Sequence, residues 1–250
     1  MFLFDPREPI STWTHAFGAF VALPVAIWLW RLCIGDQTRR LSFAVFGAGI
    51  FGCYAASTMY HGVQGSGNEI AFFITVDRVG IFGLIAATYT PILCVVFRGR
   101  ARALSLAFVW GYAALCIWLY VKFGTPRALF NTALYLGMGW GGLLFYFEAE
   151  KRLTRRAMLP LVLGGLSYSI GAIINFAGWP NPVDNVFGNH EIFHLFVMAG
   201  TAFHIDFMAR VIAPFRGTTR RRPNVNTRIG SGPLLDLQSM AAPQCKPGEN

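Results

Sequence analysis

Two histidines four residues apart, His190 and His194, stand in the run HEIFH with Glu191 between them. On an α-helix this spacing places both imidazoles on one face, where they can bind the same ion. The pattern H-E-x-x-H is also the signature of zinc metalloproteases, in which the glutamate acts as general base. A third protease ligand would follow in the chain, but Asp206 lies about three turns beyond His194. The third ligand is therefore sought upstream.

The elements that must position these residues are membrane helices. Of 250 residues 54% are hydrophobic and only 13% are charged, and the mean hydropathy is +0.47. A soluble domain would need roughly twice this charged fraction to cover its surface. Apolar runs of about 20 residues, the length that crosses the hydrocarbon core, occur at about 14–34, 41–61, 71–97, 103–121, 128–147, 157–178 and 189–212. We therefore predict an all-α membrane protein, a bundle of seven transmembrane helices.

The net charge of +9 is unevenly distributed between the loops. Basic residues are concentrated in the first, third and fifth loops and after the last span, whereas the other side has only Arg7, Lys122 and Arg127. By the positive-inside rule the C-terminus is cytoplasmic, and the charge requires no nucleic-acid partner. After the membrane domain, 1–213, the composition shifts to Arg, Pro, Gly, Asn and Ser, which predicts a disordered tail over 214–250.

The antiparallel order of the spans brings several ionisable residues to one membrane surface. These residues are His15, His61, Asp77, His190 and His194. An uncompensated polar group in hydrocarbon costs several kcal/mol, so their convergence is hard to explain as packing. The three histidines of spans two and seven offer three neutral nitrogens, and a water completes a tetrahedral Zn²⁺ site of the catalytic type. We therefore predict an intramembrane zinc site with these ligands.

Simpler interpretations remain for the other polar residues. His15 lies at the headgroup boundary, where it could cap a helix or form a simple hydrogen bond. Asp77 could form an ion pair with Arg78. His204 lies about 15 Å beyond His194 along the helix axis and cannot join the same ion. An interhelical hydrogen bond explains it best. The glycine-rich stretches 137–142 and 164–172 predict close helix packing, because small residues let membrane helices approach.

Six segments together carry a resemblance to a known family. They are E-x-x-S-x-x-T-H (Glu8, Ser11, Thr14, His15), STMYH (57–61), Asp77 with LIAATYTP (84–91), LYLGMGW (134–140), GGLSYSIGAI (164–173) and HEIFHLFVMAG (190–200). On these motifs the chain resembles the hemolysin III-like proteins, the bacterial branch of the progestin and adiponectin receptor family. That family belongs to a wider membrane hydrolase superfamily that includes alkaline ceramidases.

The resemblance implies roles for five residues. His61, His190 and His194 would be the zinc ligands, Asp77 would hold the water at the metal, and Ser57 would lie close to it. It also implies a multi-pass protein of the bacterial inner membrane. Bacterial members often have Asn at the position of Ser11 and His at that of Arg78. The receptor branch places its N-terminus in the cytoplasm, opposite to the orientation that the charges predict here.

The chemistry implied is hydrolysis of an amide or ester bond in a membrane lipid, ceramide-like or another acyl lipid. Zinc would activate the water and polarise the carbonyl, with Asp77 as general base and Ser57 orienting the water or stabilising the oxyanion. Three alternatives stay open: a receptor-like lipid binder with structural zinc, a pore-forming hemolysin, and an intramembrane metalloprotease. The polar groups cluster at one end of the spans, which argues against a pore.

Overall fold

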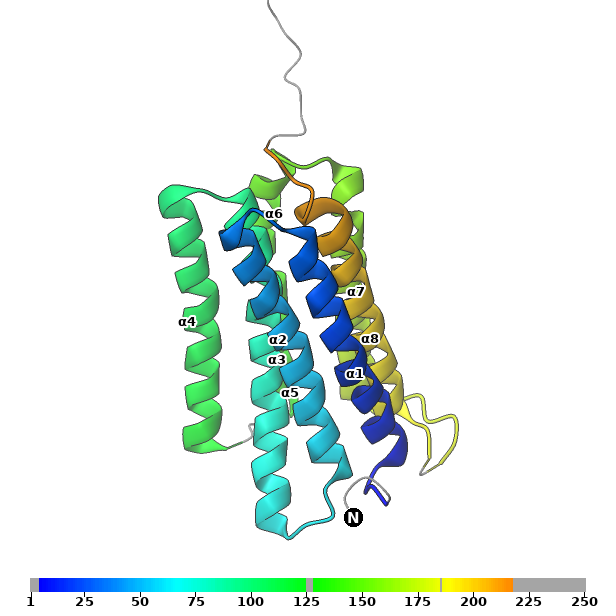
Figure 1. The fold of residues 1–250 in the computed structure, drawn as a ribbon. Coiled ribbons are helices and arrows are strands. Elements are labelled where there is room, and N and C mark those ends of the chain that lie inside the picture. The colour runs from blue at the N-terminus through cyan, green and yellow to red at the C-terminus, as the bar shows by residue number, and fades with distance from the viewer. Residues whose placement is uncertain (1–4, 125–127, 185, 218–250) are drawn as a thin grey trace, which may run out of the picture. The chain divides into compact units, whose positions relative to one another are not determined.

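The protein is a bundle of long helices that run up and down beside one another (Figure 1), described from a computed structural model. Residues 5–124, 128–184 and 186–217 are described. The helices are α1 (Pro9–Leu32), α2 (Gln37–Gly62), α3 (Gly67–Val96), α4 (Gly99–Phe123), α5 (Ala128–Trp140), α6 (Leu143–Glu150), α7 (Arg155–Ala177) and α8 (Asn189–Phe207), which continues into the π-helical turn η1 (Met208–Ile212). The predicted disordered tail lies, from residue 218 onward, outside the described residues and stays a prediction.

Six described helices are long and apolar enough to cross a membrane: α1, α2, α3, α4, α7, and α8 together with η1. They match six of the seven predicted spans, so the all-α membrane class is confirmed. The chain is a multi-pass membrane protein. Large apolar side chains on its outer surface face outward, among them Phe20 and Phe108, which are 73% and 53% exposed. Such a surface suits lipid rather than water.

The predicted continuous helix over 128–147 is instead two helices, α5 and α6, which meet at Gly141 and Gly142. Tyr89 of α3 approaches this break, and its hydroxyl donates to the carbonyl of Gly139 over 2.5 Å. A side chain at Gly142 would overlap the Tyr89 hydroxyl. The glycines therefore allow close approach of α3 but weaken the helix locally, which the hydropathy of the segment does not reveal.

Side-chain caps set the start of three spans. Asp36 accepts from the Arg39 backbone N–H at the start of α2, and Thr154 accepts from Ala157 N–H at the start of α7. Ser66 and Glu69 form a capping box at the start of α3. These caps satisfy backbone donors that the helix itself leaves unpaired, so each polar loop ends where the apolar span begins.

Glycines bring α7 and α8 into close contact, as the sequence predicted. A Cβ built on Gly171 of α7 would lie 2.7 Å from the Cβ of Phe196 of α8. Ser167, one turn earlier on α7, donates its hydroxyl to the Phe196 carbonyl over 2.8 Å. This pairing carries the N-terminal part of α8 against α7, and it therefore positions His190 and His194.

Candidate metal centre

The predicted convergence of helix ends is confirmed. The start of α1, the end of α2 and the starts of α3 and α8 lie at one end of the bundle (Figure 1). There His61 of α2 meets His190 and His194 of α8, and one potential ligand atom from each of the three lies within 4.8 Å of the other two. His61 and His194 are each only 1% exposed. The group could hold a metal ion.

The orientation of two of these rings is set by hydrogen bonds at their outer nitrogens. His61 Nδ1 donates to the Glu8 carboxylate over 2.5 Å, and His190 Nδ1 donates to the Asn175 Oδ1 over 3.0 Å. With the protons on Nδ1, both Nε2 atoms present lone pairs. These two Nε2 atoms face each other at 3.3 Å. Two facing lone pairs repel unless a cation lies near both, so the donor set fits a metal ion.

Glu8 is a site residue that the sequence motif contained but to which no role was assigned. Its own N–H donates to the His61 carbonyl over 3.0 Å, and the neighbouring Arg7 donates to the Tyr60 carbonyl over 3.0 Å. Burial raises the pKa of the Glu8 carboxyl, but the hydrogen bond from His61 and the charge of Arg7 lower it below its ordinary value. Glu8 is therefore held ionised beside His61.

Asn175 is a second residue that no sequence pattern indicated. It lies near the C-terminal end of α7, two residues before the helix ends, and also accepts from the Asn189 side chain over 3.4 Å. Only the packing of α7 against α8 brings it to His190, because 15 residues separate the two in the chain. Predicting the role of Asn175 from the sequence would have required knowing that α7 and α8 are neighbours.

Asp77 and Ser57 meet beside the histidines. Asp77 is 8% exposed and Ser57 is 2% exposed, and the Ser57 hydroxyl hydrogen-bonds to the Asp77 carboxylate. Asp77 also lies close to His61. It also forms the ion pair with Arg78 that the sequence left open, with 3.9 Å between Arg78 Nε and a carboxylate oxygen. This distance is too long for a hydrogen bond, so the carboxylate oxygens can still accept a hydrogen bond from a group bound between the helices.

His15 belongs to this site, although it is not one of the three grouped histidines. Its ring stacks on His194, with centroids 3.8 Å apart and planes inclined by 16°. It is buried, and neither ring nitrogen has a hydrogen-bond partner among the described residues. His204 lies away from the cluster, where Nε2 approaches the Leu161 carbonyl of α7 at 3.4 Å. This agrees with the predicted interhelical hydrogen bond.

Glu191 acts at the start of α8 and not at the histidines. One carboxylate oxygen accepts from the Gly188 backbone N–H over 2.8 Å, and the other accepts from the Ser11 hydroxyl over 2.9 Å. Both oxygens therefore cap the helix and tie it to α1, as expected for an acid in a first helical turn. This use of Glu191 argues against the metalloprotease interpretation of HEIFH.

Fold and site together define a multi-pass membrane protein of long helices with a three-histidine group gathered at one end. Comparison with known proteins identifies its family: the sequence model of the haemolysin-III related proteins matches residues 5–205, and the chain belongs to this family.

Individual relatives support the same assignment. The chain is 32% identical to hemolysin-3 of Bacillus cereus over 201 residues, which are 80% of this chain and 89% of the relative. It is 30% identical over 203 residues to a hemolysin-3 homolog of Bacillus subtilis (strain 168), which are 80% of this chain and 92% of the relative. The adiponectin receptor protein of Drosophila melanogaster is 26% identical over 217 residues, 79% of this chain but 49% of that protein.

Proposed function

We propose that this protein is a zinc-dependent membrane hydrolase that cleaves an amide or ester bond of an acyl lipid, ceramide-like or related. The observation that carries the proposal is the pair of facing Nε2 atoms of His61 and His190, 3.3 Å apart, with His194 in reach of both. Their outer nitrogens are bonded to Glu8 and Asn175, the arrangement by which proteins orient histidine ligands.

Three neutral imidazoles are a ligand set typical of catalytic zinc, and three protein ligands leave one coordination position open for chemistry. Bound by His61, His190 and His194, it would supply a Lewis acid that polarises a carbonyl and lowers the pKa of water. The same ligand set would also serve a structural zinc, so the role of the remaining polar residues decides between catalysis and binding.

The chain's own groups would perform the proton transfers. The Asp77 carboxylate would accept the proton of the attacking water and return it to the leaving amine or alcohol. Ser57, which hydrogen-bonds to this carboxylate, would hold it in one orientation. Once the carboxylate is protonated, the Ser57 hydroxyl could instead donate its proton to the developing oxyanion. The burial of both residues keeps bulk water from competing for these hydrogen bonds.

A lipid substrate is supported by the depth of the site. The three histidines lie within one or two turns of the ends of α2 and α8, where a membrane-spanning helix meets the headgroup layer. An amide or ester bond of an acyl lipid lies at this level, and its apolar chain would extend between the helices.

We further infer that α5 and α6 together make a seventh crossing. The chain leaves α4 at the end of the bundle near the histidines and enters α7 at the other end (Figure 1), so the segment between them must traverse the membrane.

The uneven loop charges favour an external metal centre and a cytoplasmic C-terminus in a bacterial inner membrane. Single cysteines at Asn68 and Arg100 should then be labelled by an impermeant thiol reagent from opposite sides.

The test of the function is turnover by the purified full-length protein. Elemental analysis should find about one zinc per chain. Ceramides and other acyl lipids in detergent should be hydrolysed, and a chelator should remove activity that added zinc restores. Zinc without turnover on any lipid tested would favour the alternative of a non-catalytic, receptor-like lipid binder with structural zinc; the Drosophila relative is named as a receptor. Absence of zinc would contradict both the hydrolase and the lipid binder with structural zinc.

A further inference from the structure

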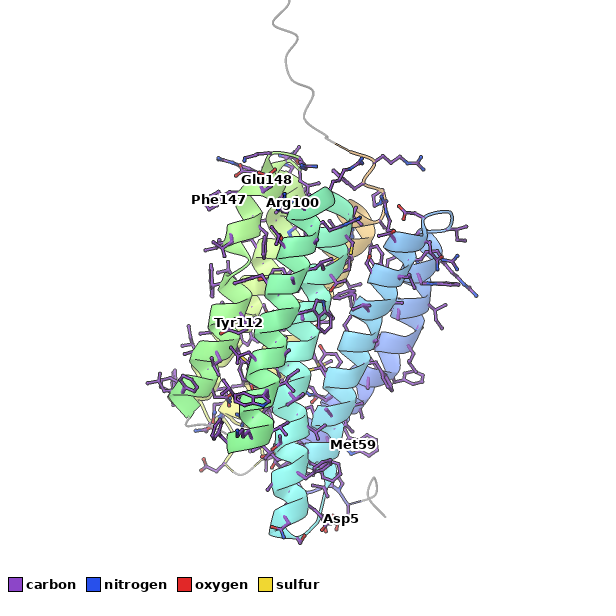
Figure 2. All side chains as sticks on the ribbon, turned by 90° about the vertical axis from the view of Figure 1, so that its left-hand side faces the viewer. Asp5, Met59, Arg100, Tyr112, Phe147 and Glu148 are labelled. Atoms are coloured by element: carbon purple, nitrogen blue, oxygen red, sulfur yellow. The ribbon has the colours of Figure 1, made fainter. Side chains whose placement is uncertain are left out.

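A second polar site lies at the opposite end of the bundle from the histidines. A cavity of about 360 Å³ opens there between the start of α2, the end of α3 and the start of α4. Figure 2 shows this end by Arg100, Phe147 and Glu148, with Asp5 and Met59 near the other end. The charged and polar residues that line the cavity are Asp36, Thr38, Arg39, Cys94, Arg98 and Arg102.

The lining carries two positive charges in excess. Its acidic residue, Asp36, forms an ion pair with Arg39 at 3.4 Å. Arg39 is also fixed by the carbonyls of Ala213 and Phe215, to which its guanidinium donates over 2.5 and 2.7 Å. Arg98 and Arg102 have neither an ion pair nor a hydrogen bond from their side chains to any other part of the chain that the structure describes.

The backbone adds to this positive potential. Arg98 is the N-cap of α4, offers no side-chain hydrogen bond to the helix, and is followed by a first turn without an acidic residue. The first N–H groups of this 25-residue helix therefore keep their partial positive charge, which an anion at the cavity would neutralise. A loop that only sets membrane topology needs charge alone. Topology alone does not require that arginines at two loops, Arg39 after α1 and Arg98 and Arg102 after α3, surround one cavity.

We propose that this cavity binds a phosphate group, carried either by the headgroup of an anionic phospholipid or by free phosphate. Arg98 and Arg102 would bind the phosphate oxygens through their guanidinium groups, and Thr38 offers a hydroxyl donor beside them. The proposal is independent of the metal centre, because it uses no residue of that site. It therefore stands or falls without regard to catalysis.

Cys94 in the cavity wall supplies a direct readout. It is partly exposed, whereas Cys33, Cys53 and Cys116 are buried. Full-length protein in nanodiscs of phosphatidylglycerol, or of a galactolipid that carries no phosphate, would be treated with N-ethylmaleimide. Peptide mass spectrometry would then follow the alkylation of each cysteine. We expect phosphatidylglycerol to slow alkylation of Cys94 at least threefold, roughly the effect of a site that is mostly occupied. Equal rates in both lipids and with millimolar inorganic phosphate would overturn the proposal.

A pair of charge-matched variants makes the test specific. Replacing Arg98 and Arg102 with Gln should abolish the protection and weaken phosphatidylglycerol binding, counted by native mass spectrometry, by roughly 30-fold. Replacing Arg100 and Arg156 with Gln removes the same charge from the same end but outside the lining, and should leave both measurements unchanged. Identical behaviour of the two double variants would contradict the site.

The same variants identify the source of the phosphate. Protection by phosphatidylglycerol that requires Arg98 and Arg102 assigns the cavity to a lipid headgroup. Protection by inorganic phosphate alone, with the same arginine requirement, assigns it to free phosphate. Thermal unfolding of each variant in detergent would be measured in parallel, so that a folding defect is recognised by a lowered transition temperature, whether or not the protein binds zinc.

Discussion

The carboxylate of Glu8 lies 2.5 Å from His61 Nδ1, although 53 residues separate them in the chain. Glu8 stands just before α1 and His61 one residue before the end of α2, so the contact joins two helix ends. It also fixes which nitrogen of His61 carries the proton. The Nε2 lone pair is thereby directed at His190 and not into solvent.

Glu8→Gln should weaken zinc binding about 10- to 100-fold, the effect usual for losing a carboxylate that orients a histidine ligand. The amide keeps the size of the side chain but can no longer act as a charged acceptor for Nδ1–H. Competition against a chelator of known affinity measures the change. Glu69→Gln serves as control, because Glu69 caps α3 at the same end without touching a histidine. Equal affinities for the two variants would refute the role of Glu8.

Removing a grouped histidine should abolish stoichiometric zinc. His61→Ala and His194→Ala each leave two imidazoles, too few to hold zinc tightly inside a membrane protein. His204→Ala is the comparison, since His204 is also buried but contacts the Leu161 carbonyl and the Tyr168 ring of α7 and lies outside the histidine group. Elemental analysis of the purified proteins checks this. Full zinc in either ligand variant would end the assignment of the centre.

Much of this site could be predicted from the sequence, and the part that could not has a physical reason. His61, His190 and His194 are expensive in hydrocarbon, so their depth in antiparallel spans already indicates a meeting point. Asn175 carries no charge and stands in an apolar stretch, so nothing in the sequence marks it. It depends on the pairing of α7 with α8, a tertiary fact that hydropathy does not encode.

The fold shows the same division. Lengths of apolar segments predicted seven spans, because crossing the hydrocarbon sets a minimum length, and six of them match single helices among the described residues. The break between α5 and α6 was missed. The break lies where Tyr89 contacts the backbone at Gly139. The hydropathy of an apolar segment is the same whether or not a neighbouring helix contacts it, so the sequence does not reveal the break.

Asp77→Asn should remove turnover and keep zinc. The amide preserves the shape and the hydrogen bond with Ser57 but cannot accept a proton, and loss of a general base costs about 10²- to 10⁴-fold in rate. Ser57→Ala should cost less, about 10- to 100-fold, because one hydrogen bond to a charged group is lost. Hydrolysis rates and zinc content are measured on the same preparations. Asp184→Asn, in an exposed loop, provides the baseline. Unchanged hydrolysis by Asp77→Asn would remove the general base from the proposal.

Gly171→Ala should destabilise the bundle, whereas Gly165→Ala on the same helix should not. A Cβ at Gly171 meets the Phe196 Cβ at 2.7 Å, and that atom can move only if α8 moves, whereas a Cβ at Gly165 meets nothing within 4 Å. Overpacking costs about 1–3 kcal/mol, while Ala in place of an unhindered helical Gly gains up to about 1 kcal/mol. Thermal unfolding in detergent should therefore move in opposite directions for the two variants.

Gly171→Ala should also weaken zinc binding at the metal centre. Asn175 lies four residues after Gly171 on the same face of α7, and its Oδ1 accepts from His190 over 3.0 Å. Forcing α7 away from α8 lengthens this contact and frees the His190 ring to turn. We therefore expect Gly171→Ala to bind zinc more weakly than Gly165→Ala even at temperatures where both are folded. Equal zinc affinity at unequal stability would show that Asn175 does not orient His190.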